Sequence, residues 1–167
     1  MYTKGFTKIE VLIIAAIIGI LGITAVIAVS TARSRTRDAV RMSDVRQMQA
    51  GLELYFINHN EYPQSAEYIP LGMAGTSCLA EQGFLAVCND NTYLESIGAT
   101  PATGLDGLSS CGDISNAYCY VAEDGDYRIG FELEHDNPII NLQKGLNCAT
   151  QSGLEPGACD LPVTISQ

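Results

Sequence analysis

The stretch of sequence that decides the fold is the uncharged run from Val11 to Val29, VLIIAAIIGILGITAVIAV. At about 1.5 Å per residue, a helix over this run is roughly 28 Å long, close to the hydrocarbon thickness of a bilayer. Two other interpretations are a buried core helix, which is usually shorter and apolar on one face, and a cleavable secretory signal with Ala28 and Ser30 near the cleavage point. Because the run is longer than the roughly 7–15 residues of a signal core, a retained membrane-spanning helix is favoured.

Charge divides the 167-residue chain into two different halves. Residues 1–46 carry seven of the nine basic side chains and three acids, a net charge of +4. Residues 47–167 carry Arg128 and Lys144 against sixteen acids, a net charge of −14. An acidic second half repels phosphates, so we expect no direct binding of nucleic acid. A composition that is 47% hydrophobic and 17% charged also excludes a disordered or collagen-like chain.

All six cysteines follow the apolar run, and an even number after an export signal indicates disulfides in an oxidising compartment. No pair has the close spacing of a zinc site. Many connectivities are open, but sequential pairs at separations of 10, 8 and 11 residues close the shortest loops. The positive-inside rule favours the opposite orientation, because five arginines follow the run. We give the cysteines more weight and place the C-terminal half outside. The cysteines are Cys78, Cys88, Cys111, Cys119, Cys148 and Cys159.

The helical pattern continues beyond the apolar run. Apolar residues recur at three- to five-residue steps from Val40 to Phe56, and the first proline of the chain is Pro63. We therefore predict one helix from about Thr7 to about Asn58, apolar all round in its first half and amphipathic in its second. The rest of the chain is too short to cover such a helix, so part of it must be buried in lipid or against copies of itself.

After Pro63 the sequence changes to short apolar pieces separated by turn residues. Tyr118–Ala122 and Asp126–Glu134 alternate apolar and polar residues around an Asp-Gly turn, which predicts a β-hairpin. Ile139–Leu142 and Val163–Ile165 are weaker strand candidates, and Thr92–Ile97 fits either a short helix or a strand. The predicted fold class is α+β, with a long N-terminal helix packed through its second half on a small antiparallel sheet.

The motif Gly5-Phe6-Thr7-Lys8-Ile9-Glu10 leads directly into the apolar run. A carboxylate at the edge of a membrane helix is unfavourable unless paired, although Glu10 alone could reach the head groups or pair with Lys8. The pattern G-F-T-x-I-E followed by an apolar run resembles the N-terminus of bacterial type IV prepilins and of the related pseudopilins of type II secretion. The resemblance extends over about residues 1–63, as far as Glu61-Tyr62-Pro63. Lys8 departs from it, because an apolar residue is usual there.

This resemblance implies that a prepilin peptidase removes the leader, residues 1–5, after Gly5, and that the new N-terminal residue, Phe6, is methylated. Glu10 would then neutralise the Phe6 amine of a neighbouring subunit, and a mispaired subunit would leave two bare charges in a low dielectric. The implied organisation is a transmembrane and assembly segment over 6–30, an amphipathic segment over 31–60 and a disulfide-stabilised β-sheet domain over 61–167, with Cys148–Cys159 closing its C-terminal loop. Because the apolar run has no proline, we expect any loosening of the helix in a filament to begin at Gly19–Gly22.

Arg33, Arg37 and Arg41 recur at four-residue steps, where like charges repel. They form either a solvated face or lipid anchor, or they meet acidic residues of neighbouring subunits. The carboxylates of residues 123–126 and 132–136 could ligate calcium, but a turn and a strand explain them better, so we predict no metal and no cofactor. With two histidines, no nucleophile elbow and no phosphate loop, we predict no enzymatic activity.

These features together predict the structural subunit of a type IV pilus, a homopolymer built by membrane assembly machinery and used for adhesion, motility or DNA uptake. Before assembly the chain would span the inner (cytoplasmic) membrane once, in contact with lipid and with its C-terminal domain outside. After assembly it would belong to an extracellular pilus. The alternatives are a pseudopilin of type II secretion and a monomeric, membrane-anchored extracellular binding domain.

Overall fold

The computed structural model describes residues 5, 7–89, 91–123 and 125–159 of the chain. The chain divides into two compact units, residues 1–36 and 37–167. Helix α1 (Lys8–His59) contributes to both units, and its ends lie within one residue of the prediction. It ends at Asn60, which has a φ of 56° and donates its N–H to Phe56 O at 2.7 Å. A left-handed residue in this position is a common way for a helix to stop.

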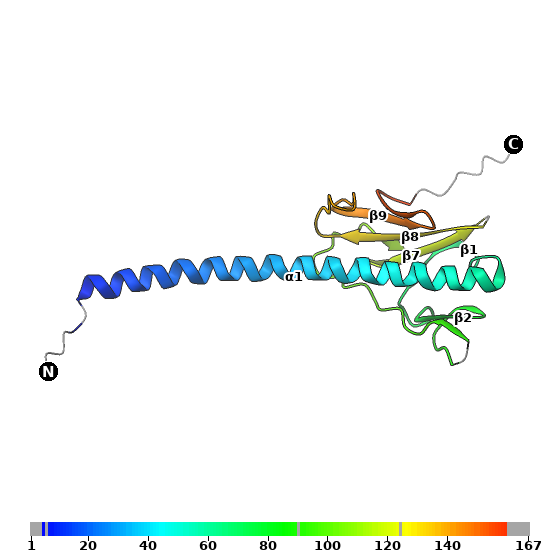
Figure 1. The fold of residues 1–167 in the computed structure, drawn as a ribbon, viewed down its shortest axis with the longest axis horizontal. Coiled ribbons are helices and arrows are strands. Elements are labelled where there is room, and N and C mark those ends of the chain that lie inside the picture. The colour runs from blue at the N-terminus through cyan, green and yellow to red at the C-terminus, as the bar shows by residue number, and fades with distance from the viewer. Residues whose placement is uncertain (1–4, 6, 90, 124, 160–167) are drawn as a thin grey trace. The chain divides into compact units, whose positions relative to one another are not determined.

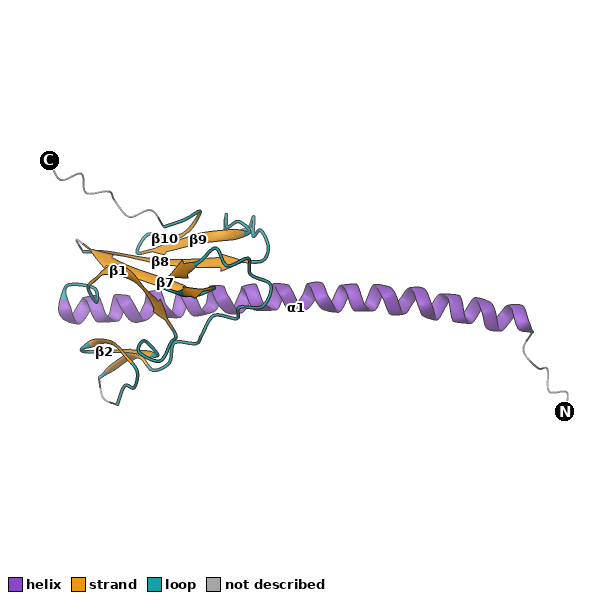
Figure 2. Cartoon of the chain, turned by 180° about the vertical axis from the view of Figure 1, so that it is seen from behind, coloured by secondary structure: helices purple, strands orange, loops and turns teal. Residues whose placement is uncertain are grey.

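The second unit contains a five-stranded antiparallel sheet in the order β1-β7-β8-β9-β10. Figures 1 and 2 show the later turns of α1 lying along one face of this sheet. A three-stranded sheet, in the order β3-β2-β4, and a two-stranded sheet formed by β5 and β6 complete the unit. The strands are β1 (Ser65–Leu71), β2 (Cys78–Ala80), β3 (Gly83–Leu85), β4 (Thr92–Leu94), β5 (Ser110–Cys111), β6 (Ile114–Ser115), β7 (Tyr118–Glu123), β8 (Asp126–Leu133), β9 (Gly145–Thr150) and β10 (Gly153–Pro156).

One apolar core joins α1 to the sheet. Val45, Met48 and Leu52 recur at helical spacing on α1 and are buried. Alternate residues of the strands face them, so that Tyr127, Ile129, Phe131 and Leu133 of β8 are buried on one side of the sheet. The structure therefore confirms the predicted α+β class.

The predicted hairpin is β7 and β8, paired in register from Cys119 opposite Gly130 to Glu123 opposite Asp126. Gly125, in its turn, has a φ of 87°, which suits glycine, while Asp124 lies outside the described residues. Thr92–Leu94 is a strand, which decides between the two interpretations of that segment.

The prediction of a strand at Ile139–Leu142 is wrong. A backbone pair between Asn137 and Leu142 closes a turn there, and Ile139 is 92% exposed. The next two strands, β9 and β10, were not predicted, since their residues are small or polar. The strand proposed at Val163–Ile165 lies outside the described residues.

Candidate functional site

Helix α1 begins at a capping box formed by Thr7 and Glu10. The Glu10 N–H donates to Thr7 Oγ1 at 3.3 Å, and the Thr7 N–H donates to Glu10 Oε2 at 3.3 Å. This reciprocal pair satisfies N–H groups that a helix start leaves without an intrahelical acceptor. Gly5 is exposed just before the cap, and Phe6 lies outside the described residues. The Thr-x-x-Glu spacing could have revealed the cap, which gives Glu10 a structural role besides the one that the resemblance implies.

The apolar run that follows is exposed in the described part of the chain. Leu12, Ile18 and Val26 have exposed fractions of 68%, 64% and 71%. The helix is long and apolar enough to cross a membrane, and none of its apolar window is buried against the described residues. Burial of one such side chain contributes about 1.5–3 kcal/mol, so a surface of this extent favours lipid or another protein over water. Arg33, in the same unit, is exposed.

A cluster of five charged or ionisable residues ties α1 to the end of β8. We call Arg37, Asp38, Arg41, Glu134 and His135 the charged cluster. Arg37 donates through Nε and Nη2 to the two oxygens of Glu134 at 2.7 and 2.6 Å. Arg41 donates through Nη1 to Asp38 Oδ1 at 2.7 Å and to Glu134 Oε1 at 2.8 Å. The Arg41 side chain is 0% exposed and that of Arg37 is 29% exposed, so Arg41 depends more on its partners.

The paired arginines shift the titration of the cluster. The hydrogen bond from Arg37, opposed by burial and reinforced by Arg41, holds the pKa of the Glu134 carboxyl below its usual value. The same hydrogen bond raises the pKa of the Arg37 guanidinium. Both groups are therefore ionised at neutral pH, and the bidentate pair is held by charge as well as by geometry.

These contacts bear on the two interpretations that the sequence leaves open for the arginines, a solvated face or lipid anchor and contacts with acidic residues of neighbouring subunits. The carboxylate partners of Arg37 and Arg41 in the structure, Asp38 and Glu134, belong to the same chain. The physical reason is that β8 ends beside the helix and brings Glu134 to the two arginines. Arg41 has no exposed surface left for a neighbour. For Arg33 and for the partly exposed Arg37, an inter-subunit contact stays a prediction.

The remaining polar groups of the cluster fix the surrounding backbone. Asp38 accepts hydrogen bonds from the backbone N–H groups of Glu134 and His135 at 2.9 and 3.1 Å, and lies 3.1 Å from His135 Nδ1. Arg41 donates to the carbonyl oxygens of Pro101 and Thr103. Because every donor of a buried guanidinium needs an acceptor, these bonds hold the loop that follows Ala99 against the helix.

The second set of carboxylates that could ligate calcium, Glu132, Glu134 and Asp136, has other partners. Glu132 is buried and accepts hydrogen bonds from the backbone N–H groups of Asp106, Leu108 and Ser109 at 2.6, 2.8 and 3.3 Å. Asp136 accepts the Lys144 N–H at 2.7 Å. Within the described ranges, no group of three or more histidine, cysteine or acidic side chains is placed to hold a metal ion. Backbone amides and arginines therefore use the oxygens that an ion would need.

The six cysteines form three disulfides, Cys78–Cys88, Cys111–Cys119 and Cys148–Cys159. This is the connectivity that the sequence spacing favours. Gly130 lies beneath two of them, because a Cβ added there would lie 3.8 Å from Cys119 Cβ and 3.9 Å from Cys159 Sγ. Tyr68 further anchors the last bridge by donating its hydroxyl to Cys159 O at 2.7 Å. The bridges thus fasten three separate loops of the second unit.

Comparison with known proteins gives one informative similarity. Over 64 residues the chain is 36% identical to a fimbrial protein of Neisseria meningitidis serogroup A / serotype 4A (strain DSM 15465 / Z2491). The aligned part covers 37% of this chain and 36% of that protein, so the chain spans about a third of the length of the relative that it matches. No family model matches, and no solved structure does. The similarity supports a pilin-like relationship for the part of the chain that it covers.

Proposed function

We propose that the chain is the structural subunit of a type IV pilus, polymerised through its N-terminal helix into a surface filament. The observation that carries the proposal is the uncovered apolar part of α1. Residues 37–159 supply the core of the second unit, whereas the apolar run of the first unit has no cover among the described residues. A membrane before assembly, and other subunits after it, would provide that cover.

The proposed maturation follows the N-terminal motif. A prepilin peptidase would cut after Gly5 and remove residues 1–5, and the new amine of Phe6 would be methylated. Residues 6–30 would then act as the transmembrane and assembly segment, residues 31–60 as the amphipathic part of the helix, and residues 61–167 as the domain outside the membrane. The pairing of Glu10 with the Phe6 amine of a neighbour would align subunits, because two unpaired charges in an apolar filament interior are unfavourable.

The charged cluster supports the proposed orientation. Arg37 and Arg41 form ion pairs with Asp38 and Glu134, so they add little free positive charge beside the apolar run. The arginines after the apolar run therefore argue less strongly for a cytoplasmic second unit than the sequence alone suggests, and they conflict less with the outside location that the disulfides indicate. An outside location for the second unit agrees with its three disulfides.

A mass measurement on filaments sheared from cells tests the proposal. The expected chain lacks residues 1–5 and carries a methyl group on Phe6. A monodisperse membrane protein that retains Met1, with no filaments, would instead indicate a membrane-anchored binding domain. Recovery of the processed chain with the secretion machinery, and not in surface filaments, would indicate a pseudopilin.

Two matched variants separate the two roles of Glu10. Glu10→Gln keeps an N3 residue able to complete the capping box but removes the charge, whereas Thr7→Val keeps the charge and removes the cap hydroxyl. If the charge aligns subunits, Glu10→Gln should abolish filaments and Thr7→Val should reduce them only slightly. The exposed Glu95→Gln serves as the control for loss of a carboxylate. Normal filaments from Glu10→Gln would refute the charge-pairing step without affecting the assignment of processing.

The expected loosening at Gly19–Gly22 is also part of this proposal. The isolated chain is helical through both glycines, so the loosening concerns the filament. Unbroken helical density there in a filament reconstruction would contradict it.

A further inference from the structure

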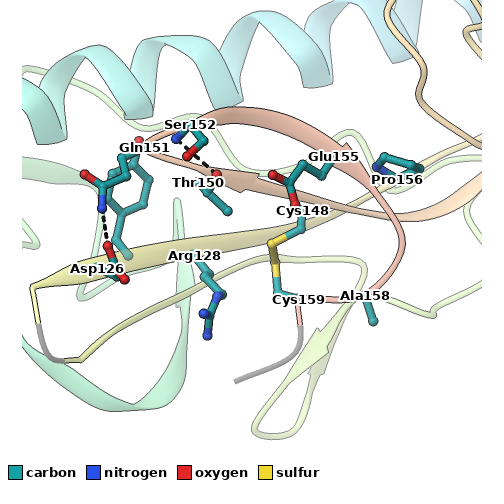
Figure 3. A pocket seen from close by; sticks show the side chains of 11 residues that line it. Asp126, Arg128, Cys148, Thr150, Gln151, Ser152, Glu155, Pro156, Ala158 and Cys159 are labelled. Atoms are coloured by element: carbon teal, nitrogen blue, oxygen red, sulfur yellow. Dashed lines mark hydrogen bonds between the residues drawn. A yellow bond between two sulfur atoms is a disulfide. The ribbon is translucent and has the colours of Figure 1, made fainter. Parts of the chain in front are cut away.

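A polar hollow lies beside the last disulfide on the face of the sheet opposite α1. Its volume is about 480 Å³, within the range of about 300–1,000 Å³ usual for small-molecule sites. Figure 3 shows Arg128 between Asp126 and the Cys148–Cys159 bridge, with Thr150, Gln151 and Ser152 above it. The side chains that carry the argument are Asp126, Arg128, Thr150, Gln151, Ser152 and Glu155.

Strand register explains why these residues gather. Arg128 of β8 pairs with Thr150 of β9, and Cys148 of β9 pairs with Glu155 of β10. Side chains alternate along a strand, so with Tyr127 and Ile129 in the core, Arg128 points to the other face. The disulfide closes one side of the hollow, and the absence of a side chain at Gly130 leaves room for the bridge. The walls are therefore held in place before any ligand arrives.

Arg128 is the unusual member of this set. Its side chain makes no hydrogen bond or ion pair with any residue in the ranges 7–89, 91–123 and 125–159, and Arg128 is only partly exposed. The half-buried Arg37 and the buried Arg41 of the same unit are both paired with carboxylates. Arg128 and Lys144 are the only basic side chains among residues 47–167, which carry sixteen acids. An arginine side chain that has no partner among the described residues, in a polar hollow of so acidic a unit, can donate two hydrogen bonds to a carboxylate.

The other lining groups suit hydroxyls. Asp126 accepts a hydrogen bond from Gln151, and Thr150 Oγ1 accepts the Ser152 N–H at 3.2 Å. The hydroxyl hydrogens of Thr150 and Ser152 can therefore be donated to a ligand, and Glu155 can accept hydrogen bonds from one. Acceptors, hydroxyl donors and one guanidinium together match a ring that bears several hydroxyls and one carboxylate.

We propose that this hollow binds an acidic saccharide, with the sugar carboxylate on Arg128 and the ring hydroxyls on the Thr150–Ser152 turn and Glu155. The acidic side chain of another protein offers the same carboxylate but leaves the hydroxyl-binding groups without partners. The proposal goes beyond the filament function, since every residue of the hollow lies in the second unit and a monomer would carry the site.

Saturation-transfer NMR on the full chain in detergent micelles tests the proposal with methyl β-D-glucuronoside as the probe. We expect a Kd of about 1 mM, as for other small sites with few contacts. Replacement of the charge-assisted pair in Arg128→Gln should weaken binding at least about tenfold. Arg46→Gln removes an exposed arginine of the same unit and should leave the Kd unchanged. The uncharged methyl β-D-glucoside should bind at least about tenfold more weakly than the glucuronoside.

Each contrary result overturns the proposal in a different way. If the glucoside binds with the same Kd as the glucuronoside, Arg128 does not bind the carboxylate. Equal binding of glutarate, an acyclic dicarboxylate, would indicate a site for acidic peptides. An unchanged Kd in a folded Arg128→Gln chain would place the ligand elsewhere. If that variant fails to fold, the comparison of the three ligands on the unmodified chain decides the matter, and none of these results bears on polymerisation.

Discussion

Replacement of Arg41 by methionine tests whether the charged cluster holds the second unit together. Methionine has a similar length and fits an apolar site, but it donates no hydrogen bond. In the structure Arg41 is 0% exposed and donates to Asp38, Glu134 and two loop carbonyls. The variant therefore removes one donor from each of two nearly buried carboxylates, and it removes the guanidinium donors of two carbonyl oxygens.

The size of the effect follows from what remains. Loss of one partner from a buried ion pair costs about 3–5 kcal/mol of unfolding free energy. Glu134 keeps its bidentate bonds to Arg37, and Asp38 keeps two backbone donors, so the lower end of this range applies. We expect Arg41→Met to lower the unfolding free energy by about 3 kcal/mol. Arg37 is partly exposed, so its removal should lower the unfolding free energy by clearly less than the removal of Arg41. The exposed Arg33 should cost less than about 0.5 kcal/mol.

Urea unfolding of the oxidised full chain in detergent, followed by near-ultraviolet circular dichroism of its eight tyrosines, measures this series. With a slope of about 2 kcal/mol per molar urea, the midpoint should fall by roughly 1.5 M for Arg41→Met. Equal midpoints for the Arg33 and Arg41 variants would refute the reasoning and restore the idea that these arginines serve contacts between subunits. Arg41→Lys is the partial rescue, because one ammonium keeps the charge but cannot reach all of the acceptors.

Three further predictions concern titration and packing. The folded-state pKa of Glu134 is depressed, so its stabilising contribution is present above the usual glutamate pKa of about 4.3 and is lost as pH falls through the folded value. The urea midpoint should therefore fall below about pH 4, and this fall should be smaller in Glu134→Gln. Burial raises the pKa of Tyr62 to about 12, so the contribution of Tyr62 to the unfolding free energy is complete below about pH 10 and is lost as pH rises towards 12. In an absorbance titration at 295 nm, the Tyr62→Phe variant should lack one tyrosine that ionises late. Gly104→Ala should lower the melting temperature by several degrees, because the φ of Gly104 is 81° and an added Cβ would overlap the Glu134 carboxylate. Gly75→Ala is the control and should leave the melting temperature unchanged, because an added Cβ there has nothing within 4 Å.

The helix and the hairpin could be predicted from the sequence because each carries a local pattern. Apolar periodicity continues up to Phe56 and no proline interrupts it before Pro63, so the ends of α1 follow within one residue. The alternation around the Asp-Gly turn likewise identifies β7 and β8. In both elements the information lies within a few residues of the feature that it specifies.

Strand β9 has no such pattern. Asn147 lies in the middle of β9, and asparagine is a residue type that usually indicates a loop, yet Asn147 is fully buried. Its side chain accepts the Gln143 N–H and donates to the carbonyl oxygens of Gln143 and Gly145, so it folds the preceding turn as a backbone group would. A polar residue that is satisfied within its own segment looks the same in a sequence as one that faces water.

The partners of Arg37 and Arg41 could not be predicted for another reason. Glu134 lies 97 residues after Arg37 and 93 residues after Arg41, and only the packing of β8 on α1 brings them together. Four-residue spacing shows that the arginines share a face of the helix, but it does not show what covers that face. The candidate residue at the helix start is the opposite case, since Thr7 and Glu10 form a cap within one turn.

The two outer strands of the five-stranded sheet both contain proline. Pro70 lies in β1, opposite Cys119, and Pro156 ends β10, opposite Asn147. Proline has no N–H to offer to a further strand, so neither border of the sheet is a continuous template for strand addition. A chain that is crowded with copies of itself, in a membrane or along a fibre, is thereby protected from amyloid-like growth. In the proposed filament, copies of the chain could then associate through their helices without also aggregating through their sheets.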